Sequence, residues 1–304
     1  MVGYHRSVLL EEAIKALHVK KGEWYLDCTL GDGGHTLEIL KQGGKVIGMD
    51  VDPQALKRAK ERLCDLGYFE DQGLRLVQGN FRDLENIISQ TESGDQKFAS
   101  VKSNLAGAIF DLGVSSLQLE SPERGFSFGM MGPLDMRMDP TLAVRALDLL
   151  NSLSRKKLYE IFNQLGEEKY SWRLANALVL AREVKPFTNT LELSKAVEKV
   201  VGGKREKIHP ATRVFQALRM TVNDELGALK EGLDKVRNEI KKDGYIVVIS
   251  FHSLEDRIVK NTFREWQFAG FGEVLTKKPI VPTEKEVVDN PRSRSAKMRV
   301  FKRS

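Results

Sequence analysis

The sequence predicts an α/β protein with a doubly wound, mostly parallel sheet that a mostly helical insertion interrupts. In the first third of the chain, apolar runs of strand length alternate with amphipathic segments of helix length, which is typical of βαβ units. From about residue 119 to residue 203 the periodicity is helical, and the next apolar run of buried-strand type is 244–251. The insertion therefore separates two parts of one sheet.

The expected elements follow in order. Strands are expected at 24–30, 45–50, 74–79, 105–111 and 244–251. Helices are expected from about Gly34, after Pro53, over 211–240 as one long amphipathic helix, and over 253–266. Residues 89–104 are polar and rich in Ser, so we expect a surface loop there. We assign 1–118 and 214–304 to the sheet domain and 119–213 to the helical insertion.

Composition narrows the class of protein. The chain has 304 residues, of which 41% are hydrophobic and 30% charged, as in a globular protein. No apolar run approaches the roughly 18 residues that a membrane span needs, so we expect a cytoplasmic protein. The two cysteines and five histidines lack zinc-ligand spacing, and we expect no metal.

The net charge of +6 is concentrated in the C-terminal tail. Residues 289–304 hold six basic side chains and one acid. A basic stripe on an otherwise balanced protein indicates a polyanionic partner, although a solvated tail explains the charge equally well. The six bases are Arg292, Arg294, Lys297, Arg299, Lys302 and Arg303.

The stretch DCTLGDGGH, residues 27–35, is a glycine turn between the first strand and a helix. The dinucleotide fingerprint fits Gly31 and Gly33 but fails at Thr36. A phosphate loop is excluded because no Gly-Lys-Ser/Thr follows. A strand that ends in an acid and runs into Gly-x-Gly also suits the nucleoside turn of S-adenosylmethionine enzymes. An ordinary turn with a helix-capping Asp remains open.

Later strand ends favour the S-adenosylmethionine interpretation. Asp50 ends the second strand, where an acid can accept both ribose hydroxyls. Phe81 follows the third strand, where its ring can flank the adenine, and Asp111 ends the fourth. In an open α/β sheet the ligand binds at the carboxyl ends of the strands, so Asp27, Asp50, Phe81 and Asp111 are expected to converge there.

Several sequence segments resemble those of the bacterial small-subunit (16S) ribosomal RNA cytosine-N4 methyltransferases, and the match runs from Tyr4 and His5 to the tail, over nearly the whole chain. Small departures are Thr36 for an expected Ser, Met220 for Ile, and a longer loop at 89–104. The segments are GDGGHT, DVDP, FDLGVSSLQLESPERGFSFGMMGPLDMRMDP, HPATRVFQALRMTVNDEL, VVISFHSLEDRIVK and NPRSRSAKMRV.

The resemblance implies a class I, Rossmann-like methyltransferase that methylates N4 of a specific cytidine near the decoding centre, with S-adenosyl-L-methionine as methyl donor. It implies that the insertion recognises the substrate, and it leaves open a monomer or a homodimer. The donor-binding residues that it implies are Gly33, Gly34, His35, Asp50, Phe81, Asp111 and Gln118. His35 and Gln118 rest on the resemblance alone.

Cytosine N4 is a poor nucleophile, so an acceptor on its N–H would assist methyl transfer. Asp111, or a carbonyl in the stretch after it, is the first candidate. His252 follows the last predicted strand and is either a second catalytic candidate or a cap of the next helix. In that stretch, Ser253 and Asp256 have the spacing of a capping box.

The insertion contains candidate residues for RNA binding. Phe126 and Phe128, in RGFSF, either receive an unstacked base or pin the insertion onto the sheet. Asp135 and Asp139 flank Arg137, which favours an ion-paired loop over a metal site. The candidates for phosphate contacts are the six tail bases together with Lys204, Arg205, Lys207 and Arg213.

Two alternatives to the ribosomal RNA enzyme remain open at this point. One is an amino-methyltransferase that acts on DNA or on another RNA. The other is a non-catalytic module that binds S-adenosylmethionine and RNA.

Overall fold

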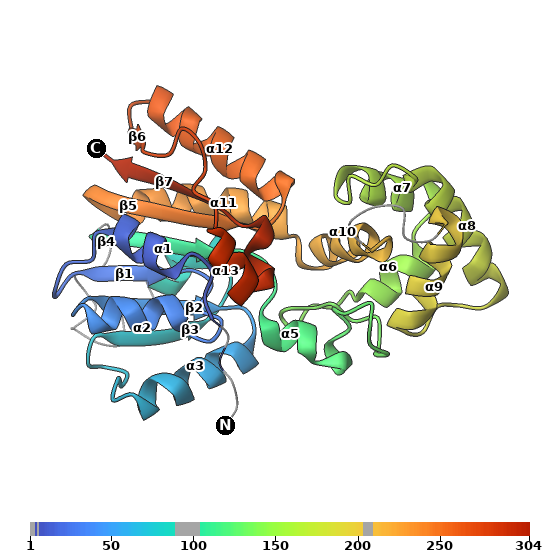
Figure 1. Ribbon diagram of the computed structural model, residues 1–304, viewed down its shortest axis with the longest axis horizontal. Coiled ribbons are helices and arrows are strands. Elements are labelled where there is room, and N and C mark those ends of the chain that lie inside the picture. Colours follow the sequence, from blue (N-terminus) through green and yellow to red (C-terminus); the bar gives the residue numbers. More distant parts are fainter. Residues whose placement is uncertain (1–3, 5, 89–103, 203–208) are drawn as a thin grey trace. The chain divides into compact units, whose positions relative to one another are not determined.

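The computed structural model describes residues 4, 6–88, 104–202 and 209–304. The chain divides into a sheet unit, residues 1–113 with 226–304, and a helical unit, residues 114–225 (Figure 1). The predicted loop at 89–104 lies almost wholly outside the described residues, as do Lys204, Arg205 and Lys207. None of the described helices is long and apolar enough to cross a membrane.

The sheet unit contains seven strands in the order β3-β2-β1-β4-β5-β7-β6. The pairs from β3 to β5 are parallel, and β7 is antiparallel to both β5 and β6. The strands are β1 (Trp24–Asp27), β2 (Lys45–Asp50), β3 (Leu74–Gln78), β4 (Leu105–Asp111), β5 (Ile240–Ser250), β6 (Gly272–Val274) and β7 (Lys297–Arg303). The prediction of a doubly wound, mostly parallel sheet is confirmed.

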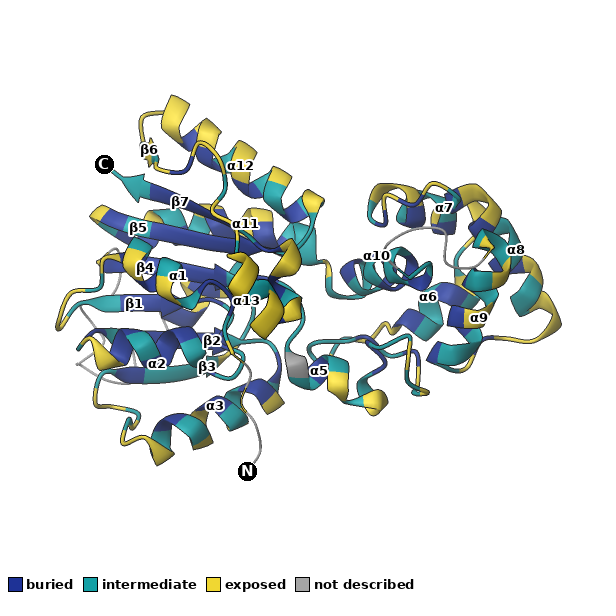
Figure 2. Ribbon diagram, viewed as in Figure 1, coloured by how far each residue is buried: buried dark blue, intermediate teal, exposed yellow. Residues whose placement is uncertain are grey.

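Helices cover both faces of this sheet because successive strand residues point to opposite sides. Ile47 and Phe110 pack with α11 and α12 in one core, whereas Val46 and Ile109 pack with α1 and α2 in the other. Figure 2 shows the buried strands between these layers. The helices of the sheet unit are α1 (Leu10–Leu17), α2 (Gly34–Lys41), α3 (Pro53–Asp65), α11 (Glu225–Glu239), α12 (Ser253–Phe268) and α13 (Glu284–Asp289).

The helical unit is built around its own apolar core. Phe162, Leu178 and Leu218 are fully buried in it. Its helices are α5 (Ser116–Glu120), α6 (Ala146–Ser152), α7 (Arg155–Gln164), α8 (Ser171–Val184), α9 (Thr190–Val201) and α10 (Ala211–Asn223).

Two predicted boundaries are wrong. The single helix expected over 211–240 is broken at Asp224, whose φ of 46° places it in the left-handed region and ends α10. The boundary placed between 213 and 214 falls inside α10. Val214 and Leu218 of that helix are buried in the helical core, so α10 belongs to the helical unit and the chain returns to the sheet unit only afterwards.

Part of the C-terminal tail is folded into the sheet and is not a solvated basic tail, whereas Arg294 is exposed. Seven of its residues, Lys297–Arg303, form β7, and Lys297–Lys302 pair with β5. Arg299 is only 6% exposed and donates from Nε to Asp256 Oδ1 at 2.6 Å. Lys302 pairs with Asp243 at 2.7 Å, and Arg303 donates to backbone carbonyls that include that of Ile240. These bases are therefore engaged in holding the sheet unit together.

Candidate active site

Three acids end parallel strands and lie at one edge of the sheet. Asp27 ends β1, Asp50 ends β2 and Asp111 ends β4. Because these strands are parallel and in register, their carboxyl ends meet, as the sequence predicts. Burial is the main cause that raises the pKa of both Asp50 and Asp111, and the charge of the nearby Asp27 raises both pKa values further.

Asp27 is buried and its carboxylate is hydrogen-bonded on both oxygens. The Thr36 hydroxyl donates to Oδ2 at 2.7 Å, and the Thr29 N–H donates to Oδ1 at 3.2 Å. Burial raises the pKa of Asp27 to about 6 in spite of these bonds. Thr36, the residue that argued against a dinucleotide turn, thus has a specific polar role in joining α2 to β1.

Asp50 holds the glycine turn through its carboxylate. Its Oδ2 accepts the Gly31 N–H and its Oδ1 accepts the Asp52 N–H, both at 2.9 Å. Each carboxylate oxygen has a second lone pair that remains able to accept a ligand hydroxyl. Burial, outweighing the two N–H donors, raises the pKa of Asp50 to about 6.

One carboxylate oxygen of Asp111, Oδ1, is left to accept a hydrogen bond from a ligand. Its backbone N–H donates to Thr29 Oγ1 at 2.6 Å, and its Oδ2 lies 3.8 Å from Nδ1 of the buried His35. The other oxygen, Oδ1, is buried without a hydrogen-bond partner among the described residues. Burial and then the charges of Asp27 and Glu255 raise its pKa well above the ordinary value. A cationic or N–H-bearing ligand fits an acceptor of this kind.

The glycine turn is shaped by backbone geometry and close packing. Gly33 precedes α2 with a φ of 72°, a left-handed conformation that glycine adopts without strain. A Cβ on Gly34 would collide with the Ser7 hydroxyl, whereas a Cβ on Gly31 would meet open space. Gly31 is therefore the turn glycine with room beside it, although the predicted donor-binding glycines were Gly33 and Gly34.

A clamp on the far side of the turn could not be predicted from the sequence. Arg58 donates two hydrogen bonds to the Asp32 carboxylate, at 2.9 and 3.0 Å, and Arg62 donates to the Asp32 carbonyl at 2.9 Å. Both guanidinium groups lie over the ring of Tyr4, at 5.6 and 4.9 Å from its centroid. We call Tyr4, Asp32, Arg58 and Arg62 the turn clamp.

Phe81 follows β3 as expected, but its ring is half-buried against the sheet core. It meets Phe110 edge-on with 5.3 Å between ring centroids. Gly232 of α11 leaves room for it, since a Cβ there would collide with the ring. Its contact with an adenine remains a prediction.

Gln118 lies in the helical unit, in the first turn of α5. The side-chain oxygen of Gln118 accepts the Ser115 backbone N–H at 3.1 Å, and the backbone N–H of Gln118 donates to Ser115 Oγ at 3.2 Å. This reciprocal capping box orients Gln118. Its role toward the donor remains a prediction.

His252 is the N-cap of α12. Its Nδ1 accepts the Glu255 N–H at 3.4 Å, and its own backbone N–H donates to Glu255 Oε2 at 3.3 Å. The capping box is therefore His252 with Glu255, and the box predicted from Ser253 and Asp256 is wrong. Asp256 instead pairs with Arg299. A catalytic role for His252 remains a prediction beside this capping role.

The residues of the insertion that were candidates for RNA binding form contacts within the helical unit. Phe126 is buried in its core, and Phe128 stacks on His209 with 4.5 Å between ring centroids. Arg137 forms two hydrogen bonds with Asp135, at 2.7 and 2.8 Å, so the predicted ion-paired loop is confirmed. Arg213 lies 3.8 Å from Glu168.

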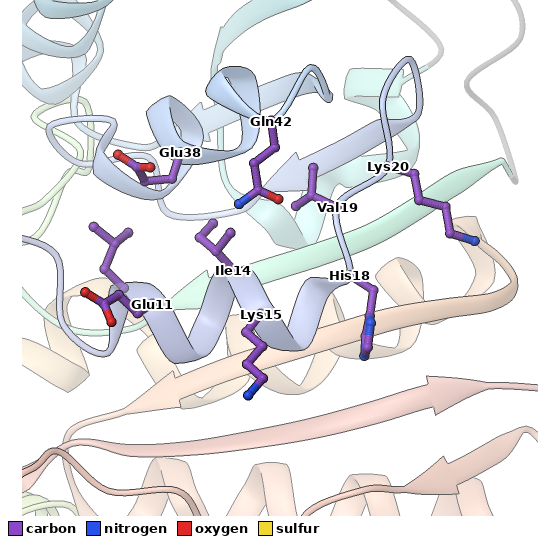
Figure 3. Close-up of a pocket in the computed structure, with 9 residues that line it drawn as sticks. Glu11, Ile14, Lys15, His18, Val19, Lys20, Glu38 and Gln42 are labelled. Atoms are coloured by element: carbon purple, nitrogen blue, oxygen red, sulfur yellow. The ribbon is translucent and has the colours of Figure 1, made fainter.

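A separate hollow of about 730 Å³ opens beside α1 and α2 (Figure 3). Its lining includes His18, Val19 and Lys20, which precede β1, and Gln42, which precedes β2. These positions belong to the amino ends of the strands, and no predicted site residue lines the hollow. The candidate active site therefore remains at the opposite, carboxyl ends.

The whole chain can now be compared with known proteins. The family model described as "MraW methylase family" matches residues 3–304. The chain belongs to the MraW methylase family.

Curated relatives of this MraW methylase match it along nearly their full length. Ribosomal RNA small subunit methyltransferase H of Persephonella marina is 45% identical over 98% of this chain and 99% of its own. The protein of the same name from Carboxydothermus hydrogenoformans is 44% identical over 97% and 96%. A solved rRNA methylase from Streptococcus thermophilus matches with a TM-score of 0.44 and 11% identity, over 97% of this chain and 93% of its own.

Proposed function

We propose that this protein transfers a methyl group from S-adenosylmethionine to N4 of a cytidine in small-subunit ribosomal RNA. The observation that carries the proposal is the similarity, at 44–45% identity and nearly full length, to proteins named ribosomal RNA small subunit methyltransferase H. The cluster of Asp27, Asp50 and Asp111 at the carboxyl edge supports it chemically.

The site residues fit a donor that carries cationic groups and ribose hydroxyls. Asp50 offers lone pairs to the two hydroxyls while it holds the Gly31 N–H. The unpartnered Oδ1 of Asp111 offers an acceptor to an ammonium or an amine. The donor itself supplies an electrophilic methyl on a sulfonium, so the residues of the chain mainly have to position the two reactants.

We assign the proton of the attacking amine to Asp111. The raised pKa of its carboxyl makes it a stronger base than an ordinary Asp. The Thr29 hydroxyl fixes the Asp111 backbone through its hydrogen bond with the N–H. His252 keeps α12 in place through its capping box, and we assign it a positioning role.

Labelled S-adenosylmethionine offered with purified small subunits, free small-subunit RNA and DNA tests the proposal. We expect label in N4-methylcytidine, identified by mass spectrometry of the digested RNA. Label in DNA but in neither ribosomal substrate would overturn the proposal. Tight donor binding with no label anywhere would favour the non-catalytic module. The comparison of free RNA with the assembled particle identifies the physiological substrate.

A further inference from the structure

The helical unit exposes a large aromatic side chain that its core does not use. Trp172, near the start of α8, is 55% exposed. Its indole meets the Tyr159 ring of α7 edge-on, with 5.5 Å between centroids and 79° between planes. The Tyr159 ring thus supports the indole on one side, while more than half of Trp172 remains exposed. Figure 2 shows exposed positions along both helices.

Unpaired cations lie on the same side of α7 as Tyr159. Arg155 and Lys156 precede Tyr159 by four and three residues, which places them on its face of the helix. Both are exposed, and within the described parts of the chain neither has an ion-pair partner. Their neighbour Lys157, by contrast, is paired with Glu160 at 2.9 Å.

A third cation extends this surface on α8. Arg173 is exposed and its guanidinium lies 5.7 Å from the centroid of the Tyr170 ring. Arg155, Lys156, Tyr159, Trp172 and Arg173 together form what we call the Trp172 surface. It combines a supported indole with three positive charges, and the adjacent acid Glu160 is paired with Lys157.

We propose that the Trp172 surface binds unpaired nucleotides of the substrate RNA. An unstacked base stacks on the indole, and Arg155 and Lys156 contact the phosphates beside it. The partner is RNA rather than protein because unpaired cations beside an exposed aromatic match a polyanion with flat bases. The proposal rests on the proposed function only for the identity of this RNA as small-subunit ribosomal RNA.

Three variants test the two parts of the surface. Trp172→Ala should weaken the binding of labelled small-subunit RNA about tenfold, because stacking on the indole is lost. Trp172→Phe should restore most of it. The double variant R155Q/K156Q should reduce the slope of log affinity against log salt by about 1.4 to 1.8, for two phosphate contacts. Melting curves of all variants should match the wild type, since these side chains are exposed.

The matched control is K277Q/K278Q. It removes the same charge from two exposed lysines of the sheet unit, for which the structure gives no ion pair. The control should leave the salt slope of RNA binding unchanged. Donor binding, measured by calorimetry, should be unchanged in every variant.

The outcomes separate this proposal from the proposed function. Wild-type RNA affinity in W172A, together with equal salt slopes for R155Q/K156Q and the control, would overturn the Trp172 surface. Lost affinity for intact subunits with unchanged affinity for free RNA would overturn it too, in favour of a protein partner. If the wild type binds RNA through Trp172 but methylates none, the surface stands and the proposed activity falls.

Discussion

Charge is arranged differently at the carboxyl ends of the parallel strands and along the antiparallel strand β7. Asp27 and Asp50 have no Lys or Arg partner within the part of the chain that the structure describes, and both have pKa values of about 6. On β7, by contrast, Arg299 and Lys302 are paired with Asp256 and Asp243. Acids without cationic partners cost folding free energy and remain available to a ligand, whereas the paired bases serve the fold.

The largest effect expected at the carboxyl ends is on methyl transfer. Asp111→Asn keeps the shape of the side chain but cannot accept a proton. We expect the single-turnover rate with saturating donor to fall by about 10² to 10⁴, the usual contribution of general base catalysis. The backbone bond with Thr29 is independent of the side chain, so the fold should persist. A rate within threefold of the wild type would remove Asp111 from the chemistry.

On β7 the expected effect is on stability. Burial acts to raise the pKa of Asp256, but the bonds and charge of Arg299 outweigh it and keep the pKa below the ordinary value. Arg299→Met leaves a largely buried carboxylate without its main partner, which should cost about 3 to 5 kcal/mol in the free energy of unfolding in urea. Lys297→Gln, at an exposed side chain 3.6 Å from Asp256, is the control and should cost much less.

The variant R299M also distinguishes a role of Arg299 in the fold from a role in RNA binding. If Arg299 serves the fold alone, R299M should leave the salt slope of RNA binding unchanged at a temperature where the variant is folded. A slope that falls by about one unit would mean that Arg299 contacts a phosphate, and the basic tail would regain its RNA role.

Thr36→Val tests the hydrogen bond that accompanies the buried Asp27. The loss of the hydroxyl donor should destabilise the protein by about 1 to 3 kcal/mol at pH 8, where Asp27 is ionised, and by less at pH 5, where it is mostly protonated. The sign follows from the raised pKa. Ionised Asp27 opposes folding, so its unfavourable effect on stability grows as pH rises from about 4 through about 6.

Urea unfolding at both pH values measures this effect. Thr36→Ser keeps the hydroxyl and serves as the control, with stability close to that of the wild type at either pH. Equal losses for T36V at pH 5 and pH 8 would show that the bond does not depend on the charge of Asp27.

Asp50→Ala tests the ribose assignment. We expect donor affinity to fall at least tenfold, because a charge-assisted acceptor of two hydroxyls is removed. In the wild type, affinity should also fall as pH drops through about 6 and Asp50 becomes protonated. Calorimetry across pH 5 to 8 measures both effects. An unchanged dissociation constant in a folded variant would exclude Asp50 from the donor site.

The carboxyl-end acids could be predicted from the sequence because a parallel sheet brings strand ends together whatever the loops do. The strand β7 was missed because its bases were counted as charge, although Met298, Val300 and the intervening Arg299 alternate as a strand does. The break at Asp224 had a local signal too, since Asn and Asp tolerate the left-handed conformation. The turn clamp had none, because Asp32 meets Arg58 and Arg62 only through tertiary packing.

The smallest expected effect concerns that clamp. Arg62→Gln removes the hydrogen bond to the Asp32 carbonyl and the contact with the Tyr4 ring. A net hydrogen bond of about 0.5 to 1.5 kcal/mol corresponds to a two- to tenfold loss in donor affinity if the clamp holds the turn in its binding shape. Lys57→Gln, which removes the same charge from an exposed position of α3, should leave affinity unchanged. Equal affinities for the two variants would mean that Asp50 alone, through the Gly31 N–H, is sufficient to hold the turn.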